Sequence, residues 1–210
     1  MIYFLFRVIK INEPVPLDAE IEAVYTNAGH ILGACSIALT LENKTLVFSG
    51  DIGRDNDVLM YPPTKPTKAD YIFLESTYGN RIHPDTDVKA ELEMYINNTV
   101  KKGGTIIIPS FAVERAQMVM YLLWQLKEEK KIPNIPYIID TPMGISVLEI
   151  FQNNRKWHKL PEHEYIAMCK MFTMIRDYQE TIDTIYDKQP KVVIAASGMI
   201  TGGRDRKSVV

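Results

Sequence analysis

The chain has 210 residues, of which 46% are hydrophobic and 24% are charged, as in an ordinary soluble globular protein. This length allows one large domain or two small ones, with enough chain to bury a core. The formal net charge of −2 excludes a global basic field, so any nucleic-acid binding would have to use a local patch.

The cysteines and the N-terminus indicate a cytoplasmic protein without a membrane segment. The two cysteines, Cys35 and Cys169, are too few to stabilise a fold of this size by disulfide bonds. We therefore expect buried thiols in a reducing compartment. The first nine residues are apolar but too short to span a bilayer, and they lack a basic region and a cleavage site. We expect them to form an edge or buried strand, and the chain to begin partway through a domain.

The first third of the chain has the pattern of a β-sheet. Residues 10–23 contain two prolines and are predicted to be a connection with little regular structure. Residues 36–41 and 45–48 are predicted strands, and the polar turn between them makes a β-hairpin. After a proline-rich loop, residues 69–74 are predicted to be a buried strand that ends at Glu75.

From residue 87 onward strands alternate with helices. A predicted helix from Asp87 is stopped by Gly103 and Gly104. We then expect strands at 105–109, 137–140 and 191–196, and helices at 112–130, 143–153 and 176–187. Residues 158–174 are ambiguous because Pro161 breaks any single helix. The alternation predicts a parallel sheet covered on both faces, and a domain change near residues 80–90.

Two polar residues flank the predicted hairpin. His30 lies in a glycine-flanked loop before the first hairpin strand, and Asp51 directly follows the second. The hairpin therefore brings an imidazole and a carboxylate to one edge of a sheet, an arrangement that is common in metal sites. The alternative is a hydrogen-bonded core histidine and an ordinary turn aspartate.

Three further features suggest chemistry. Glu75 ends an apolar strand, where it is either positioned for function or caps the turn through backbone donors. Residues 109–115 open a helix directly after a strand, so that Ser110, the helix N-terminus and Arg115 could hold a phosphate. Residues 197–204 form a second, glycine-rich junction that could cradle an anion. Each junction has the alternative of an ordinary helix start or turn.

Six motifs occur in order along the chain: AGHILGA at 28–34, SGDIGR at 49–54, ESTYG at 75–79, PSFA at 109–112, DTPM at 140–143, and SGM at 197–199 followed by GGR at 202–204. This series resembles the β-CASP branch of the metallo-β-lactamase superfamily, which includes the cleavage and polyadenylation endonuclease and ribonuclease J. The resemblance extends from about Val24 to Arg204.

The resemblance implies an α/β fold. It comprises a partial metallo-β-lactamase αββα layer at residues 1–86 and a Rossmann-like β-CASP cap with a mainly parallel sheet at residues 87–210. It also implies a zinc-dependent ribonuclease that cleaves RNA phosphodiester bonds with two zinc ions.

The resemblance assigns roles to particular residues. His30 would be a zinc ligand and Asp51 the carboxylate that bridges two zincs. Glu75 would match the acidic motif that opens the cap and supports the site, and Asp51 and Glu75 would be the catalytic residues. Substrate phosphates would be bound by residues of the two junctions, namely Ser110, Arg115, Ser197, Gly198, Thr201, Gly203 and Arg204.

The family's His-x-His-x-Asp-His motif does not occur in this sequence, and neither does a histidine soon after Arg204. We therefore expect a fragment, a truncated product or an impaired enzyme that binds metal weakly or not at all and does not cleave RNA efficiently. It could associate with itself or with a completing chain. Two alternatives remain: a non-catalytic RNA-binding or assembly module, and a metallo-β-lactamase-fold hydrolase of a small molecule. The cap motifs argue against the latter.

Overall fold

The structure is a computed structural model that describes residues 7–82 and 86–196. The chain divides into two compact units. Unit 1 comprises Met1–His83 together with Trp157–Lys159, and unit 2 comprises Pro84–Lys156 and Leu160–Val210. The interpretation of these units as a metallo-β-lactamase part and a cap stays a prediction.

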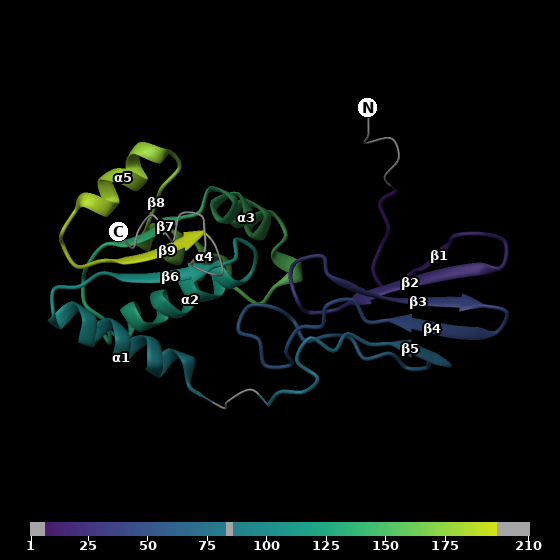
Figure 1. The fold of residues 1–210 in the computed structure, drawn as a ribbon. Helices are drawn as coiled ribbons and strands as arrows, with labels where there is room; N and C mark the ends of the chain where they lie inside the picture. Colours follow the sequence, from purple (N-terminus) through teal and green to yellow (C-terminus); the bar gives the residue numbers. More distant parts are fainter. Residues whose placement is uncertain (1–6, 83–85, 197–210) are drawn as a thin grey trace. The chain divides into compact units, whose positions relative to one another are not determined.

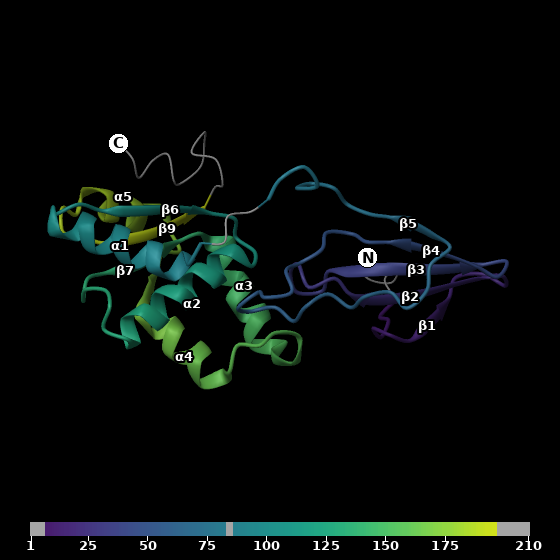
Figure 2. The same ribbon diagram turned by 90° about the horizontal axis from the view of Figure 1, so that it is seen from below.

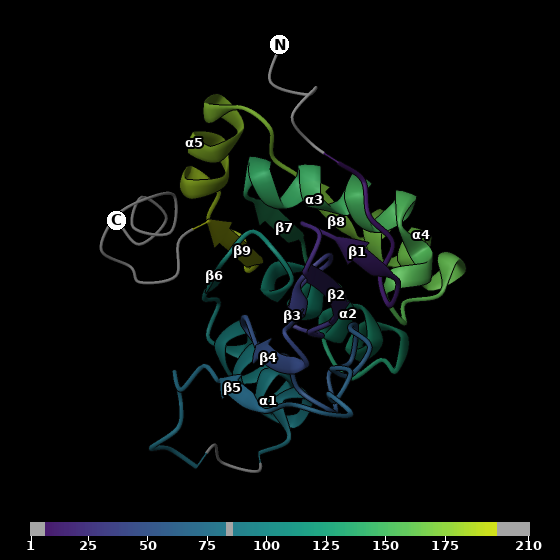
Figure 3. The same cartoon turned by 90° about the vertical axis from the view of Figure 1, so that its right-hand side faces the viewer.

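Unit 1 contains a five-stranded sheet in the order β1-β2-β3-β4-β5 (Figures 1 and 3). The strands are β1 (Pro14–Pro16), β2 (Ile21–Asn27), β3 (Cys35–Leu41), β4 (Lys44–Phe48) and β5 (Tyr71–Phe73). The first four strands pair antiparallel, whereas β5 pairs parallel with β4. All five α-helices of the described residues belong to unit 2, and a short 3-10 helix covers Arg155–Trp157.

The predicted hairpin is confirmed as β3 and β4. Its turn residues Glu42 and Asn43 both have positive φ angles, 48° and 68°, which suit the twist of a tight hairpin. The register places Ala38 opposite Val47 and Ile37 opposite Phe48. The alternation of side chains in both strands is therefore set by local sequence and by the turn.

Two predictions for unit 1 are wrong. Residues 10–23 are not a plain connection, because β1 and the start of β2 lie within them. Pro14 and Pro16 are tolerated because β1 is an edge strand. The strand predicted at 69–74 is only three residues long and is exposed rather than buried, since β5 is the opposite edge of the sheet in the described residues.

Unit 2 contains a parallel sheet in the order β6-β9-β7-β8. Its strands are β6 (Ile106–Ser110), β7 (Tyr137–Asp140), β8 (Phe172–Met174) and β9 (Val192–Ala196). The central strands β7 and β9 are almost wholly buried, as expected for a parallel sheet with both faces covered. The predicted alternation of strands and helices is confirmed.

Five helices surround this sheet: α1 (Val88–Lys101), α2 (Arg115–Glu128), α3 (Pro142–Asn153), α4 (Glu162–Met171) and α5 (Tyr178–Tyr186). Figure 2 shows α1, α2 and α4 together on one side of the sheet. Thr184 and Ile185 of α5 border a small hollow with Ile107 and Val193 of the sheet. The ambiguous segment 158–174 holds α4 and β8, with α4 beginning directly after Pro161.

The remaining expectations have mixed outcomes. Cys35 and Cys169 are free thiols, but both are partly exposed rather than buried. Within the described residues, no helix combines the length and the apolar character that crossing a membrane requires. The apolar N-terminal segment lies mostly outside the described residues, because only residues 7–9 of it are described, and they form no regular element.

Met168 of α4 is fully buried in the core of unit 2, and two methionine substitutions test how much this burial stabilises the unit. We expect Met168→Ala in α4 to lower the free energy of unfolding by about 2–5 kcal/mol, because the fully buried side chain leaves a cavity. Met143→Ala in α3 is the matched control, since Met143 is 67% exposed. Urea unfolding of both variants measures the effect, and equal losses would show that burial of Met168 does not stabilise unit 2.

Candidate functional site

Three predicted site residues lie where β3 begins and where β4 and β5 end. In the description of the site, "edge" means this line of strand ends and not the outer strands β1 and β5. His30 precedes the start of β3, and Asp51 follows the end of β4. Because these strands are antiparallel, both positions fall at the same edge. Glu75 follows β5, which runs parallel to β4 and so ends at this edge as well. The topology therefore brings together an imidazole and two carboxylates from segments far apart in the sequence.

The loops that carry His30 and Asp51 are in direct backbone contact. The Gly53 amide donates a hydrogen bond to the Ala28 carbonyl at 2.8 Å. A Cβ atom on Gly53 would lie 1.8 Å from the Gly29 carbonyl oxygen, so only glycine fits at this crossing. Gly29 itself has a φ of 70°, in the left-handed region that favours glycine. The glycines of the two motifs thus allow the loops to pack closely.

Glu75 connects the end of β5 to the Asp51 loop. Its carboxylate accepts hydrogen bonds from the Ile52 amide at 2.5 Å and from the Thr77 hydroxyl at 2.8 Å. The Ile52 amide, then the Thr77 hydroxyl and the nearby His30 imidazole, hold the pKa of Glu75 below its usual value, whereas partial burial opposes this. Glu75 therefore reaches back across the sheet edge to the residue after Asp51.

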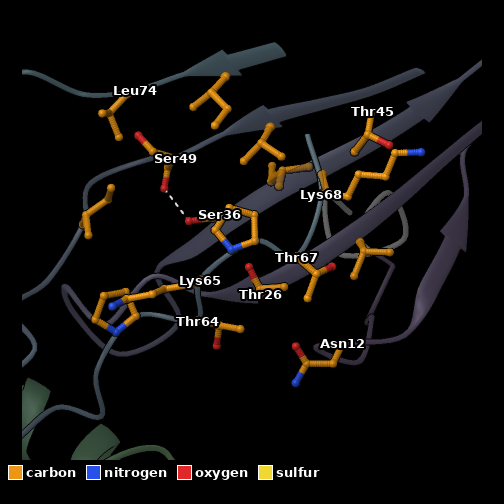
Figure 4. A pocket seen from close by; sticks show the side chains of 18 of the residues that line it. Asn12, Thr26, Ser36, Thr45, Ser49, Thr64, Lys65, Thr67, Lys68 and Leu74 are labelled. Carbon is orange, nitrogen blue, oxygen red and sulfur yellow. Dashed lines mark hydrogen bonds between the residues drawn. The ribbon is translucent and has the colours of Figure 1, made fainter. Parts of the chain in front are cut away.

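Two serines that the sequence analysis did not single out complete this edge. The Ser49 hydroxyl accepts a hydrogen bond from the Glu75 amide at 2.9 Å and donates one to the Gly50 carbonyl at 2.7 Å. The Ser36 hydroxyl donates to the Ser49 carbonyl at 2.7 Å, as Figure 4 shows. In the sequence, Ser49 opens the SGDIGR motif between an apolar strand and Gly50-Asp51, but no role was assigned to it. These bonds fix the backbone on both sides of the candidate site.

A cavity of about 880 Å³ adjoins this edge. Its floor is one face of the sheet, where Val24, Ala38, Val47 and Ile72 form a row across β2, β3, β4 and β5. The loop 63–68 lines it as well, and Figure 4 shows its Lys65, Thr67 and Lys68 beside the strands. Ser49 and Ile52 place the end of this cavity next to the candidate site.

The donor set does not make a complete zinc centre. Within residues 7–82 and 86–196, no group of three or more His, Cys, Asp or Glu side chains is placed to hold a metal ion. His30 and Asp51 are two candidate ligands, and the Glu75 carboxylate is already engaged by Ile52 and Thr77. A catalytic zinc takes three protein ligands, so these residues do not fit the group, and we derive no step through it.

The first phosphate junction differs from its prediction. Helix α2 begins at Arg115 rather than Ala112, after Glu114 with a φ of 64° and no side-chain cap. Ser110 is 1% exposed, and its hydroxyl donates to the Phe111 carbonyl at 3.1 Å. Arg115 is exposed, with its guanidinium carbon 5.4 Å from the centre of the Phe111 ring. Arg115 is therefore accessible to an anion, whereas the Ser110 hydroxyl is not.

Buried polar residues form hydrogen bonds between segments at the C-terminal ends of the unit 2 strands. The Gln117 amide nitrogen donates to the Ala112 carbonyl at 3.0 Å and to the Gly144 carbonyl at 3.1 Å. Thr141 caps α3 by accepting from the Gly144 amide. The Thr181 hydroxyl donates to Asp140 at 3.2 Å. The sequence analysis gave Gln117 no role, because its partner Gly144 is 27 residues away.

The other predicted phosphate-binding residues, Ser197, Gly198, Thr201, Gly203 and Arg204, lie outside the described residues.

Comparison with known proteins agrees with the motifs and the fold. Residues 116–209 match the family model of the Beta-Casp domain. The chain is 32% identical over 206 residues to Ribonuclease TTHA0252 of Thermus thermophilus, a match that covers 94% of this chain and 47% of that protein. These matches confirm the resemblance to the β-CASP family of the metallo-β-lactamase superfamily.

Two further relatives extend the comparison. An RNase J-like protein of Methanocaldococcus jannaschii is 28% identical over 193 residues, covering 89% of this chain and 45% of that protein. Endoribonuclease YSH1 of Eremothecium gossypii is 29% identical over 189 residues, covering 86% of this chain and 24% of that protein. The chain thus spans about half the length, or less, of the curated relatives that it matches.

The contacts of Glu75 make a pH-dependent prediction. Because its pKa is lowered in the folded state, Glu75 stabilises the fold above its ordinary pKa of 4.5, and this contribution is lost as the pH falls through the folded-state value. We expect Glu75→Gln to lower the melting temperature at pH 7 by roughly 2–4 °C, and the difference from the parent chain to vanish in acid.

Thermal unfolding between about pH 2.5 and 7 measures this effect across the titration of a carboxylate. Glu20→Gln is the control, since Glu20 is an exposed residue of unit 1 whose side chain makes no hydrogen bond or ion pair in the described residues. A Glu75→Gln deficit that is the same at every pH would contradict the assigned role of the carboxylate charge.

Proposed function

We propose that this chain forms part of a metal-dependent ribonuclease of the β-CASP type, with RNA as substrate and zinc as the metal. The observation that carries the proposal is that His30, Asp51 and Glu75 lie at the same strand ends of one sheet, supported by two loops in backbone contact and by the Glu75–Ile52 hydrogen bond. The names of the ribonuclease relatives support the choice of substrate.

Each residue of this edge receives a distinct role in the proposal. His30 and Asp51 are the metal ligands that this chain contributes. Glu75 acts on the site by holding the backbone of the Asp51 loop, because its carboxylate binds the Ile52 amide rather than pointing to solvent alone. Ser49 fixes the backbone of Glu75 in turn. Two ligands are too few to hold a catalytic zinc tightly, so the chain alone is expected to be inactive.

Arg115 supplies the RNA contact that the described residues support best. The overall charge of −2 gives no attraction to a polyanion, so the attraction has to be local. Arg115 opens α2 and is exposed, and a guanidinium can bind a phosphate with two hydrogen bonds. The nearby Phe111 side chain, which is 53% exposed, offers a ring on which a base could stack.

Metal content and RNA cleavage test the proposal for the chain alone. We expect the purified chain to retain fewer than one zinc per molecule and to cleave a single-stranded RNA no faster than buffer, with or without added zinc, because the described part of the chain offers two candidate ligands at this site, His30 and Asp51, where a catalytic zinc needs three. Elemental analysis and a gel-based cleavage assay measure both quantities. Two tightly bound zincs with zinc-dependent cleavage would show that the ligand set is complete and that the inactivity part of the proposal is wrong.

Substitution of Asp51 shows whether residual zinc occupies the proposed site. Any weak zinc binding seen by titration should decrease at least tenfold in Asp51→Ala, since a ligand is removed. Asp55→Ala is the matched control, because Asp55 is an exposed carboxylate four residues further along the same segment. An equal effect of both substitutions would place the metal elsewhere.

RNA affinity tests the role of Arg115. We expect Arg115→Ala to weaken binding of a single-stranded RNA uniformly across sequences and to reduce the slope of log K against log salt by about 1, as removal of one phosphate contact does. Fluorescence anisotropy at several salt concentrations measures it. Arg176→Ala, another exposed arginine of unit 2, should leave the slope unchanged. A slope unaffected by Arg115→Ala would exclude this contact.

A further inference from the structure

The loop between β6 and α2 contains a strained turn directly before Arg115. Glu114 has a φ of 64° and a ψ of −57°, and the Arg115 amide donates a hydrogen bond to the Val113 carbonyl at 2.8 Å. These values define a γ-turn of the rare kind with a positive φ at its central residue, which is strained when that residue is not glycine. Such a backbone persists only where the surrounding contacts hold it, so the contacts around Arg115 need an explanation.

Gln117 makes the contacts that enclose this turn. Its side chain reaches back from the first turn of α2 to the Ala112 carbonyl at 3.0 Å, so that the hydrogen bond spans residues 113–116. Its second bond, to the Gly144 carbonyl at 3.1 Å, joins the loop to the first turn of α3. A Cβ atom on Gly144 would lie 3.5 Å from the Ala112 carbonyl oxygen, so the start of α3 packs directly against the loop.

The burial of Gln117 indicates a role beyond filling space. Its side chain is fully buried, and in the part of the chain that the structure describes its Oε1 accepts no hydrogen bond. A buried polar atom without a partner costs free energy, and a methionine would fill a similar volume without that atom. What the amide adds is a nitrogen that donates to two particular carbonyls. We therefore looked for what those two bonds hold in place.

We infer that Gln117 is a positioning residue, which holds the loop 111–115 in the shape in which Arg115 meets a substrate phosphate. Gln117 is buried and does not touch the phosphate. Phe111 and Arg115 lie at the two ends of this loop, with the guanidinium carbon 5.4 Å from the ring centre. The shape of the loop therefore sets where both groups lie. A binding group that is fixed in advance loses less freedom when it binds.

This inference rests on the proposed RNA contact of Arg115 and names the residue that orients it. A cycle of Gln117→Met, Arg115→Ala and the double variant tests it in the full chain, with binding of a single-stranded RNA measured by fluorescence anisotropy at several salt concentrations. Gln117→Met should weaken binding and reduce the slope of log K against log salt by about 1, as Arg115→Ala does. The double variant should bind no more weakly than Arg115→Ala, because Gln117 acts through Arg115. Additive losses, or unchanged binding by Gln117→Met, would overturn the inference.

Two controls separate positioning from stability. Gln125→Met makes the same substitution further along α2 and should bind RNA as the parent chain does. Thr181→Val removes a buried hydrogen bond to Asp140, so it should lower the melting temperature and leave the salt slope unchanged. A slope that falls equally in Thr181→Val would show that the slope follows stability, and this would overturn the inference. Gln117→Asn serves if Gln117→Met fails to fold, since its shorter side chain cannot reach both carbonyls and should cause the same loss.

Hydrogen exchange of the Arg115 amide, measured by NMR without RNA, tests the positioning independently of the proposed function. The exchange rate should rise about tenfold or more in Gln117→Met, because the bond to Val113 opens more often, and should not change in Gln125→Met. Unchanged exchange in Gln117→Met would overturn the inference whatever the RNA results. Faster exchange together with an Arg115→Ala variant that binds RNA normally would support the positioning role and contradict the proposed RNA contact.

Discussion

The hydrogen bond from the Ile52 amide to the Glu75 carboxylate is the contact on which the candidate site depends. β5 pairs with β4 over only three residues, so strand pairing alone fixes the end of β5 weakly. Glu75 and Ser49 add side-chain links between the two strand ends, one to each side of Asp51. The charge-assisted character of the Glu75 bond makes it stronger than a neutral one. The position of the Asp51 loop is thus set by a residue more than twenty positions away.

Close packing of glycine loops provides the second constraint. At Gly53 the Asp51 loop approaches the Gly29 carbonyl more closely than any side chain permits, and the Gly53–Ala28 hydrogen bond joins the two loops. This arrangement brings His30 near enough to Glu75 to favour its ionised form. The backbone of the site is therefore organised by contacts among the loops themselves. The glycines of the motifs serve this packing, while His30 and Asp51 provide the chemical groups.

Local patterns in the sequence predicted much of the fold. The β3–β4 hairpin and the alternation in unit 2 followed from side-chain periodicity and turn residues, which act over a few positions. The prolines of β1 led to the prediction of an irregular connection, because proline is rare in strands other than edge strands. The apolar residues of β5 led to the prediction of a buried strand, although β5 is exposed. The motifs identified His30, Asp51 and Glu75. They did not reveal the Glu75–Ile52 or Gln117–Gly144 contacts, because these join residues 23 and 27 positions apart.

The apolar faces of the two sheets are covered in different ways. In unit 2, helices from the same unit cover the sheet, and Val192, Val193, Ile194 and Ala195 of β9 are almost completely buried. In unit 1, the described residues supply no α-helix, and the loop 63–68 lines the cavity above the row of Val24, Ala38, Val47 and Ile72. The apolar composition of β5 is thus the composition of an interior strand placed at an edge. Glu75 follows this strand directly, so the pairing of β5 with β4 also positions the carboxylate that holds the Asp51 loop.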